Sequence, residues 1–275
     1  MRSWRLRVLG WPVAALIGLF AAASEAGPLE DCAALLPWGA PVMSADAAPH
    51  TDLCRLAYVV RHNDLRHVPD WVAWPTPQAN AAGCLPRSDV FQPDPDLPPG
   101  AGATLADYEE PIYDRGHVAG NAYFNYADAP ERQSFLLSNM TPQTAASNRG
   151  PYKTLEVTSR EWAASVPGGI WTIAGPIFDA RTKTIGRNRV NVPAANWKIV
   201  VRDGRAVAAI IPNVKRYSGP HRWQDFILPV AEVERQAGMR INLPPTVTRD
   251  LPEPPWPVDH GPWTVAHQAA CGTLR

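Results

Sequence analysis

Hydrophobic positions recur at helical spacing along one stretch in the second half of the chain. The residues that follow Pro151 at intervals of 3, 4, 3 and 4 are all apolar or small, namely Tyr152, Leu155, Ser159, Trp162 and Val166. This spacing places them on one face of an amphipathic helix. Pro151 suits the first turn, where a missing N–H costs no hydrogen bond. The pattern therefore predicts a helix that begins near residue 151.

Elsewhere, short β-type runs alternate with about two or three helical stretches. The 30 prolines concentrate between Pro86 and Pro99 and between Pro244 and Pro262. We interpret both stretches as stiff extended loops within one domain. The sequence shows no internal repeat and no low-complexity tract. These features predict an α+β domain with a largely antiparallel central sheet flanked by helices.

The first 26 residues have the composition of a secretory signal. Three arginines precede an apolar run from Val8 to Ala23, and Ser24-Glu25-Ala26 follows as a small-x-small cleavage site. The run contains Gly10 and Pro12 and is short for a membrane-spanning helix. We therefore expect residues 27–275 to form a single exported domain, periplasmic or extracellular. No later segment approaches membrane length, so the mature protein should be soluble.

The four cysteines, at positions 32, 54, 84 and 271, all lie beyond this segment. None forms a Cys-x-x-Cys pair, so no zinc site is expected. An even number of cysteines in an oxidising compartment predicts two disulfides, and three connectivities are open. We favour Cys54–Cys84 as the local pair and Cys32–Cys271 as a bond that joins the two ends.

Candidate chemistry concentrates around the run Tyr113-Asp114-Arg115-Gly116-His117, with Asn148 thirty-one residues after the histidine and Glu156 eight residues further. An unperturbed imidazole is a usable base near pH 7, and an amide oxygen is a ligand for a hard divalent cation. Arg115 would share a strand face with His117 and could pair with a phosphate. Asn148 would lie at the helix entrance, with Glu156 about 80° around the helix from it. This set suits phosphodiester hydrolysis.

Each of these residues also has a common structural role. A lone histidine usually has a structural role, an asparagine at a helix entrance is usually a cap, and Glu156 could pair with Lys153 or Arg160 on the surface. The interpretation as a site therefore depends on the combination.

Two further stretches, Leu136–Gln143 and Ser147–Gly150, complete a pattern that resembles the DNA/RNA non-specific endonucleases, a family that includes sugar-non-specific bacterial nucleases and endonuclease G. The resemblance implies a ββα-metal (His-Me) finger. In it His117 would be the general base and Asn148 would bind Mg²⁺, with Mn²⁺ as a substitute. Glu156 would hold water on the metal and Arg115 would steady the phosphate. Asp114 and Asn139 would be hydrogen-bond partners that orient the base and the strands.

The resemblance extends in the family's order from Leu53 to about Leu251. Its strand-like segments are 53–60, 71–74, 169–178, 197–201 and 208–213. It departs from the family after His117, where an acidic residue is replaced within Val118–Ala122. It departs again four residues before Trp71, where an arginine is often found and this chain has His67 beside Arg66. Whether either residue reaches a phosphate is open.

Overall charge does not favour nucleic-acid binding. The chain has 26 basic and 26 acidic residues, and residues 27–275 keep 23 and 25 of them, a net charge of −2. Binding to nucleic acids is driven by lysine and arginine. Two local basic clusters argue in the other direction: Arg181, Lys183, Arg187 and Arg189, and then Lys215, Arg216, His221 and Arg222.

The sequence contains no P-loop, no Gly-x-Ser-x-Gly elbow and no His-Glu-x-x-His helix. Two other classes compete with the nuclease hypothesis: an inactive exported nucleic-acid-binding protein of the same fold, and a disulfide-stabilised scaffold. The joint presence of His117, Asn148 and Glu156 favours a metal-dependent endonuclease that acts on DNA and RNA and leaves 5′-phosphates, as the family does. The sequence leaves open the substrate preference, a homodimer and a protein inhibitor.

Overall fold

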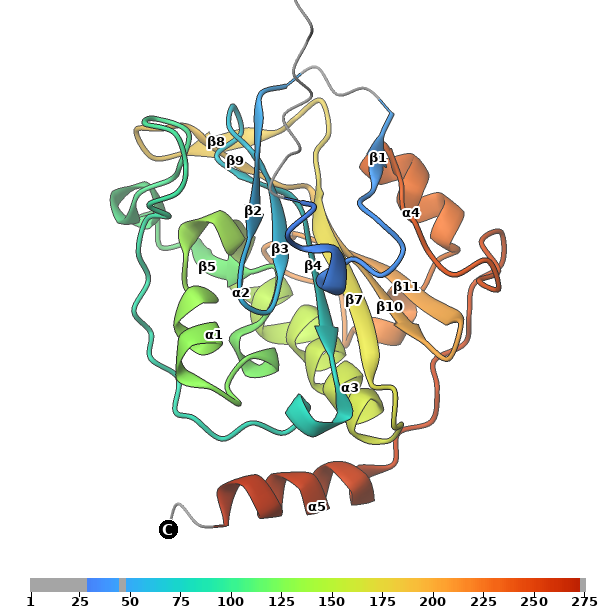
Figure 1. Ribbon diagram of the computed structural model, residues 1–275. Coiled ribbons are helices and arrows are strands. Elements are labelled where there is room, and N and C mark those ends of the chain that lie inside the picture. The colour runs from blue at the N-terminus through green and yellow to red at the C-terminus, as the bar shows by residue number, and fades with distance from the viewer. Residues whose placement is uncertain (1–28, 45–47, 273–275) are drawn as a thin grey trace, which may run out of the picture.

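Six strands form one antiparallel sheet through the centre of the protein, in the order β11-β10-β7-β4-β3-β2 (Figure 1). The computed structural model describes residues 29–44 and 48–272. The predicted signal segment, residues 1–26, lies outside the described residues. The sheet strands are β2 (His50–Cys54), β3 (Val59–Asn63), β4 (Val68–Thr76), β7 (Ile170–Ile177), β10 (Ala195–Arg202) and β11 (Arg205–Pro212). The prediction of an α+β fold with a large antiparallel sheet is confirmed.

Both faces of this sheet are covered, because alternate side chains of a strand point to opposite faces. On one face, Trp71 and Ala73 of β4 pack in a cluster with Val233 of helix α4 (Val230–Ala237). On the other face, Val200 of β10 packs with Leu155 of helix α3 (Lys153–Ala164). Burial on two sides explains why the inner strand β7 and its neighbour β10 are mostly apolar, whereas the edge strand β2 is not.

Helix α3 agrees with the predicted periodicity, but its start is more complex than expected. The chain first forms a short helical segment, α2 (Ala145–Ser147), and then a π-helical turn, Asn148–Tyr152. Gly150 breaks the helix there with φ −104° and ψ −117°. The helix also ends at Ala164, so Val166 lies beyond it. Asn148 therefore occupies an irregular turn before α3.

Smaller elements surround the sheet. The paired strands β5 (Tyr113–His117) and β6 (Met140–Thr144) precede α3, so chain order and pairing together give a ββα arrangement. Two other pairs are β1 (Val42–Met43) with β12 (Met239–Arg240), and β8 (Lys183–Ile185) with β9 (Val190–Val192). The remaining α-helices are α1 (Asp128–Gln133) and α5 (His260–Cys271), and 3-10 turns span Ala33–Leu35, Gln78–Asn80, Leu105–Tyr108, Asn121–Tyr123, Leu137–Asn139 and Trp223–Phe226.

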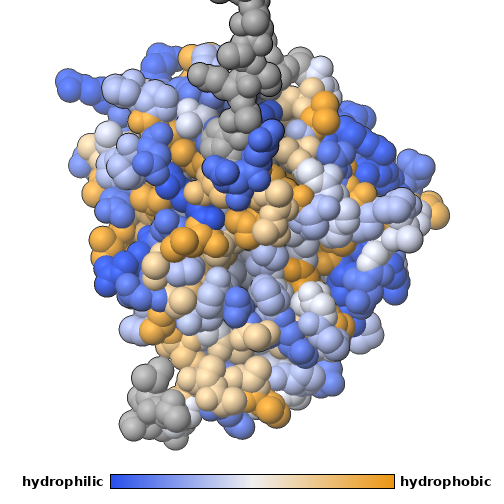
Figure 2. Space-filling model, in the orientation of Figure 1, coloured by the Kyte–Doolittle hydropathy of each residue, from blue (hydrophilic) through white to orange (hydrophobic). Residues whose placement is uncertain are grey.

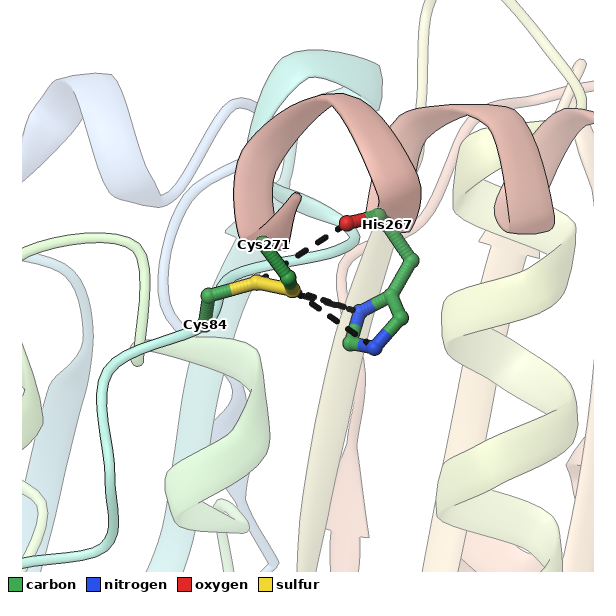
Figure 3. A group of neighbouring side chains, drawn as sticks. All are labelled: Cys84, His267 and Cys271. Atoms are coloured by element: carbon green, nitrogen blue, oxygen red, sulfur yellow. Dashed lines mark hydrogen bonds between the residues drawn. A yellow bond between two sulfur atoms is a disulfide. The ribbon is translucent and has the colours of Figure 1, made fainter. Parts of the chain in front are cut away.

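Two disulfides form, as expected, but the favoured pairing was wrong. The bonds join Cys32 to Cys54 and Cys84 to Cys271. The reason is the path of the C-terminal segment: α5 returns to pack against α3, which brings Cys271 to Cys84 rather than to the N-terminal region. His267, one turn earlier on α5, points its ring at the bond, with Nδ1 3.1 Å from Cys271 Sγ (Figure 3).

The surface is mixed in polarity. Hydrophilic side chains dominate around α4, whereas apolar residues gather over α5 at the bottom of the view in Figure 2. Val265 of α5 is 67% exposed. Within residues 29–44 and 48–272, no helix combines the length and apolar character that crossing a bilayer requires.

Candidate active site

A cavity of about 480 Å³ opens beside β5, the π-helical turn and the first half of α3. Its walls include five of the six candidate residues: Asp114, Arg115, His117, Asn148 and Glu156. The sixth, Asn139, lies buried behind the cavity. Residues separated by up to 42 positions in the chain thus meet around one space.

His117 ends strand β5, where it pairs with Met140 of β6. Its side chain is packed edge-on against Phe135, with ring centroids 4.9 Å apart, and it also contacts Phe91 at 5.6 Å. Burial, aided by the nearby Arg87 guanidinium, lowers the pKa of His117 to about 3. The ring is therefore neutral at physiological pH.

The side chain of Gln143 comes so close to position 116, just before His117, that only glycine fits there. A Cβ at this position would lie 2.3 Å from Cδ of Gln143, the buried side chain that crosses strand β5 from β6. Gln143 in turn donates from Nε2 to the backbone oxygen of His117 at 3.4 Å. The glycine of the motif thus allows the two strands to be joined behind the histidine.

Asn148 is held by the strand through Asp114. Its Nδ2 donates to Asp114 Oδ2 at 2.9 Å, and Arg149 also donates to both oxygens of this carboxylate at 2.9 and 2.6 Å. These hydrogen bonds lower the pKa of Asp114, although partial burial opposes them. With its amide nitrogen fixed in this way, Asn148 leaves its Oδ1 to the cavity, where it accepts no hydrogen bond from the described residues.

Glu156 lies in the first turn of α3 and faces the same cavity. Its partner is neither Lys153 nor Arg160, the surface cations that helical spacing offers. Glu156 Oε1 instead lies 3.3 Å from Nζ of Lys198, a residue of the central sheet. A Cβ at residue 120 would approach the same oxygen to 2.7 Å, so Gly120 lets the chain after His117 pass close to this carboxylate.

Asn139 fixes the segment that follows His117. Its Oδ1 accepts from the backbone N–H of Ala119 at 3.0 Å, and its Nδ2 donates to the backbone oxygens of Ala119 and Ser134, both at 2.9 Å. It is fully buried. Its contacts are thus to the backbone behind the base and not to the cavity.

Two arginines flank the aromatic residues around His117. Arg115 places its guanidinium 4.4 Å from the ring centre of Phe91, and Arg87 lies 4.8 Å from that of Phe135. Such stacking orients a guanidinium while its N–H groups keep access to an anion. Arg87 was not among the residues expected from the sequence, since it comes from the proline-rich loop between Pro86 and Pro99, where no periodicity gives it a position.

Three more cations line the cavity, and none was among the candidate residues: Arg149, Lys153 and Arg160. The two basic clusters suggested by the sequence, residues 181–189 and 215–222, contribute nothing to the lining. Arg66 and His67 are also absent from it. Arg66 lies 4.7 Å over the Phe178 ring, and Nδ1 of His67 is 2.8 Å from the backbone oxygen of Ala101.

The donor set of the cavity fits a hard cation that keeps most of its water. Asn148 offers one amide oxygen and Glu156 offers a carboxylate, and Mg²⁺ is commonly held by only one or two protein oxygens together with substrate phosphates. In the part of the chain that the structure describes, the one group of three His, Cys, Asp or Glu side chains at metal-ligand spacing is Cys84, His267 and Cys271, whose sulfurs form a disulfide.

Comparisons with known proteins match most of the chain to one family. The family model for DNA/RNA non-specific endonucleases matches residues 40–250. A protein named Nuclease from Nostoc sp. is 30% identical over 212 residues, which cover 70% of this chain and 74% of that protein. A Nuclease from Serratia marcescens is 28% identical over 253 residues, covering 86% and 91%.

Mitochondrial relatives match over a smaller share of their length. The human endonuclease G is 29% identical over 154 residues, half of each chain. The human nuclease EXOG is 24% identical, and the match spans 60% of that protein. Among solved structures, an EndoG/EndoGI complex contains a chain with a TM-score of 0.68 and 24% identity, covering 76% of this chain and 89% of that one. This last likeness concerns the fold.

Proposed function

The chain belongs to the DNA/RNA non-specific endonuclease family and is thus a nuclease, and we propose that it is an exported, Mg²⁺-dependent endonuclease that hydrolyses DNA and RNA. The observation that carries the proposal is the cavity itself. It places a neutral histidine, a carboxylate and an amide oxygen that no described residue hydrogen-bonds around one space lined by five cations. A phosphodiester needs these groups for its hydrolysis: a base, a cation site and cover for negative charge.

His117 is the base in this mechanism. Its Nε2 is sealed from solvent and has no hydrogen-bond partner among the described residues, so Nδ1 is the ring nitrogen that would accept a proton from incoming water. A neutral imidazole at Nδ1 accepts the proton as the water attacks phosphorus. The entering phosphate brings negative charge beside the ring and stabilises the imidazolium that forms, which offsets the low pKa of the empty site.

Asn148 and Glu156 would hold the cation. Asn148 would offer Oδ1, and the Glu156 carboxylate would accept hydrogen bonds from water that the cation holds. When bound, Mg²⁺ neutralises charge on the phosphate and assists departure of the 3′-oxygen, leaving a 5′-phosphate. Asp114 keeps the Asn148 amide in the orientation that presents this oxygen.

Substrate recognition would rest on the backbone of the nucleic acid. The cations of the cavity, among them Arg87 and Arg115, bind phosphates, which carry no sequence information. We therefore propose a sequence-tolerant enzyme that accepts both DNA and RNA. Arg87 takes part in place of an arginine near Trp71, because His67 and Arg66 point elsewhere.

Export is the second half of the proposal. The signal-like segment and two disulfides both suit a periplasmic or extracellular protein, since structural disulfides persist in oxidising compartments. Mass spectrometry of the mature protein should find an N-terminus at residue 27. An intact Met1 on protein recovered from the cytosol would contradict export without affecting the assignment of the site.

The decisive experiment incubates the purified mature chain with plasmid DNA or RNA, in Mg²⁺ or in EDTA. We expect metal-dependent cleavage that His117→Ala abolishes and that the control His221→Ala, outside the cavity, retains. A retarded but uncut plasmid would indicate an inactive binding protein. Cleavage that persists in EDTA would refute the role of the metal, and cleavage by His117→Ala would refute the base.

A further inference from the structure

Lys198 is a charged residue in the middle of the apolar sheet. It belongs to β10, and its side chain is completely buried. Its Nζ lies over three aromatic rings, 4.2 Å from the centre of Tyr152, 5.4 Å from Trp74 and 5.6 Å from Tyr123. Rings at these distances attract a cation through their negative faces. The three rings, from β4 and two turns, thus form a compartment suited to one ammonium group.

Glu156 is the carboxylate that balances this charge. Its Oε1 is 3.3 Å from Lys198 Nζ, and its side chain is 20% exposed toward the cavity. Desolvation lowers the pKa of Lys198, and Glu156 opposes the shift. Burying an ammonium costs several kcal/mol before its partner compensates, and replacing a buried ion pair as a whole by apolar side chains is often neutral or stabilising. Stability alone therefore does not account for a lysine at this position.

The contacts around Glu156 show what the lysine accomplishes. Lys198 engages Oε1 from the sheet side, and the backbone of Gly120 closes in on the same carboxylate from the segment after His117. Held from these two sides, the carboxylate lies in the wall of the cavity. A glutamate in the first turn of a helix without such a contact would sample several rotamers.

We propose that Lys198 is a positioning residue that fixes the Glu156 carboxylate toward the cation site at Asn148, an inference that rests on the proposed function. It acts from behind the site, through Glu156, and touches neither substrate nor cation. Residues that orient metal-binding groups typically affect metal affinity by 10- to 100-fold when they are replaced. The position of Glu156 is thus determined by the central sheet as well as by α3.

Binding of Mn²⁺, measured by isothermal titration calorimetry without substrate, tests the proposal independently of activity. Lys198→Met keeps the approximate length and removes the charge. Because it leaves Glu156 without its partner, its denaturation midpoint should fall, and circular dichroism verifies that it is folded before the titration. We expect its Kd for Mn²⁺ to rise about tenfold. Ser159→Ala is the matched control: it removes the 2.5 Å hydrogen bond to Tyr123 in the same cluster but leaves the ion pair. It should bind Mn²⁺ as the wild type does.

A double-mutant cycle with Glu156→Gln separates positioning from packing. If Lys198 acts through Glu156, adding Lys198→Met to Glu156→Gln should change the Kd no further. Additive losses, equal weakening in Ser159→Ala, or an unchanged Kd in Lys198→Met would each overturn the inference. Two results would instead refute the proposed cation site, and this inference with it. One is a wild-type protein that binds no Mn²⁺, and the other is an Asn148→Ala variant with the same Kd for Mn²⁺ as the wild type.

Discussion

His117 should make the folded protein sensitive to mild acid. Its pKa falls from 6.5 to about 3 because the ring is buried and Arg87 is near. Between these two values the unfolded chain binds a proton that the folded chain does not. Stability therefore rises with pH across this window and is lost as the pH falls below about 6.5. We expect His117→Asn to remove this dependence while other groups keep theirs.

The size of the effect follows from the shift. At about pH 5 the folded ring is still neutral, whereas the unfolded ring is charged. The loss of stability at this pH therefore depends only on the difference between the pH and the unfolded pKa of 6.5. This difference of about 1.5 pH units corresponds to roughly 2 kcal/mol of free energy of unfolding, at about 1.4 kcal/mol per unit. Between about pH 8 and pH 5, the wild type should thus lose roughly 2 kcal/mol more stability than His117→Asn.

Unfolding in guanidinium chloride at about pH 8 and about pH 5 gives the free energy of unfolding of each protein at both pH values. Comparing the acid loss of the wild type with that of His117→Asn removes the contribution of the carboxylates, because both proteins contain them. His221→Asn, a histidine outside the cavity, should retain the wild-type loss. An NMR titration of the His117 ring would follow the same group directly. A midpoint near 6.5, or equal acid losses in wild type and His117→Asn, would refute the description of His117 as a buried neutral base.

Three other changes test separate parts of the structure. Asp114→Asn should weaken Mn²⁺ binding about tenfold in calorimetry, because it loosens the Asn148 amide. Unchanged binding would show that Asp114 has no role in positioning Asn148 for the cation. Arg87→Gln should raise the pKa of His117 in the NMR titration and raise KM for DNA, and no change in either would exclude it from the site. Replacing Cys84 and Cys271 by serine should lower the free energy of unfolding by up to about 5 kcal/mol, because that bond closes a loop of 187 residues. Replacing Cys32 and Cys54 should lower it by about 3 kcal/mol, because that bond closes 22 residues. Equal denaturation midpoints for the two variants would contradict this chain-entropy account.

The strand that carries the Tyr113–His117 motif and the helix α3 were the most predictable elements from sequence. The run from Tyr113 to His117 and the apolar spacing after Pro151 are local patterns, and each forms the expected type of element. The π-helical turn at Asn148 was not predicted, because helical periodicity says nothing about the backbone break that Gly150 makes. That turn determines the direction of the Asn148 side chain.

Long-range contacts explain the failures. Arg87 reaches His117 because its proline-rich loop is anchored by the buried pair of Arg55 and Asp94, 39 residues apart, and by the contact of Ser138 with Asp94. Nothing local in the sequence indicates these contacts. Lys198 likewise resembles a single polar interruption of a strand until its partner, 42 residues earlier, is known. The disulfide pairing failed for the same reason, since closeness in sequence does not determine which cysteines meet.

The neutral overall composition and the proposed polyanionic substrate are compatible because charges act over short distances. At physiological ionic strength the screening length is about 8 Å, so a phosphate in the cavity responds mainly to the residues that line it. Five of these are basic and two acidic. Asp114 is occupied by Asn148 and Arg149, and Glu156 by Lys198, whereas Arg87 pairs with Asp89 outside the lining. Arg115, Lys153 and Arg160 therefore face the cavity with little acidic competition inside it. A positive cavity on an otherwise balanced surface would attract phosphates to the proposed catalytic groups but would bind the rest of a nucleic-acid strand weakly, which would favour release of cleaved products.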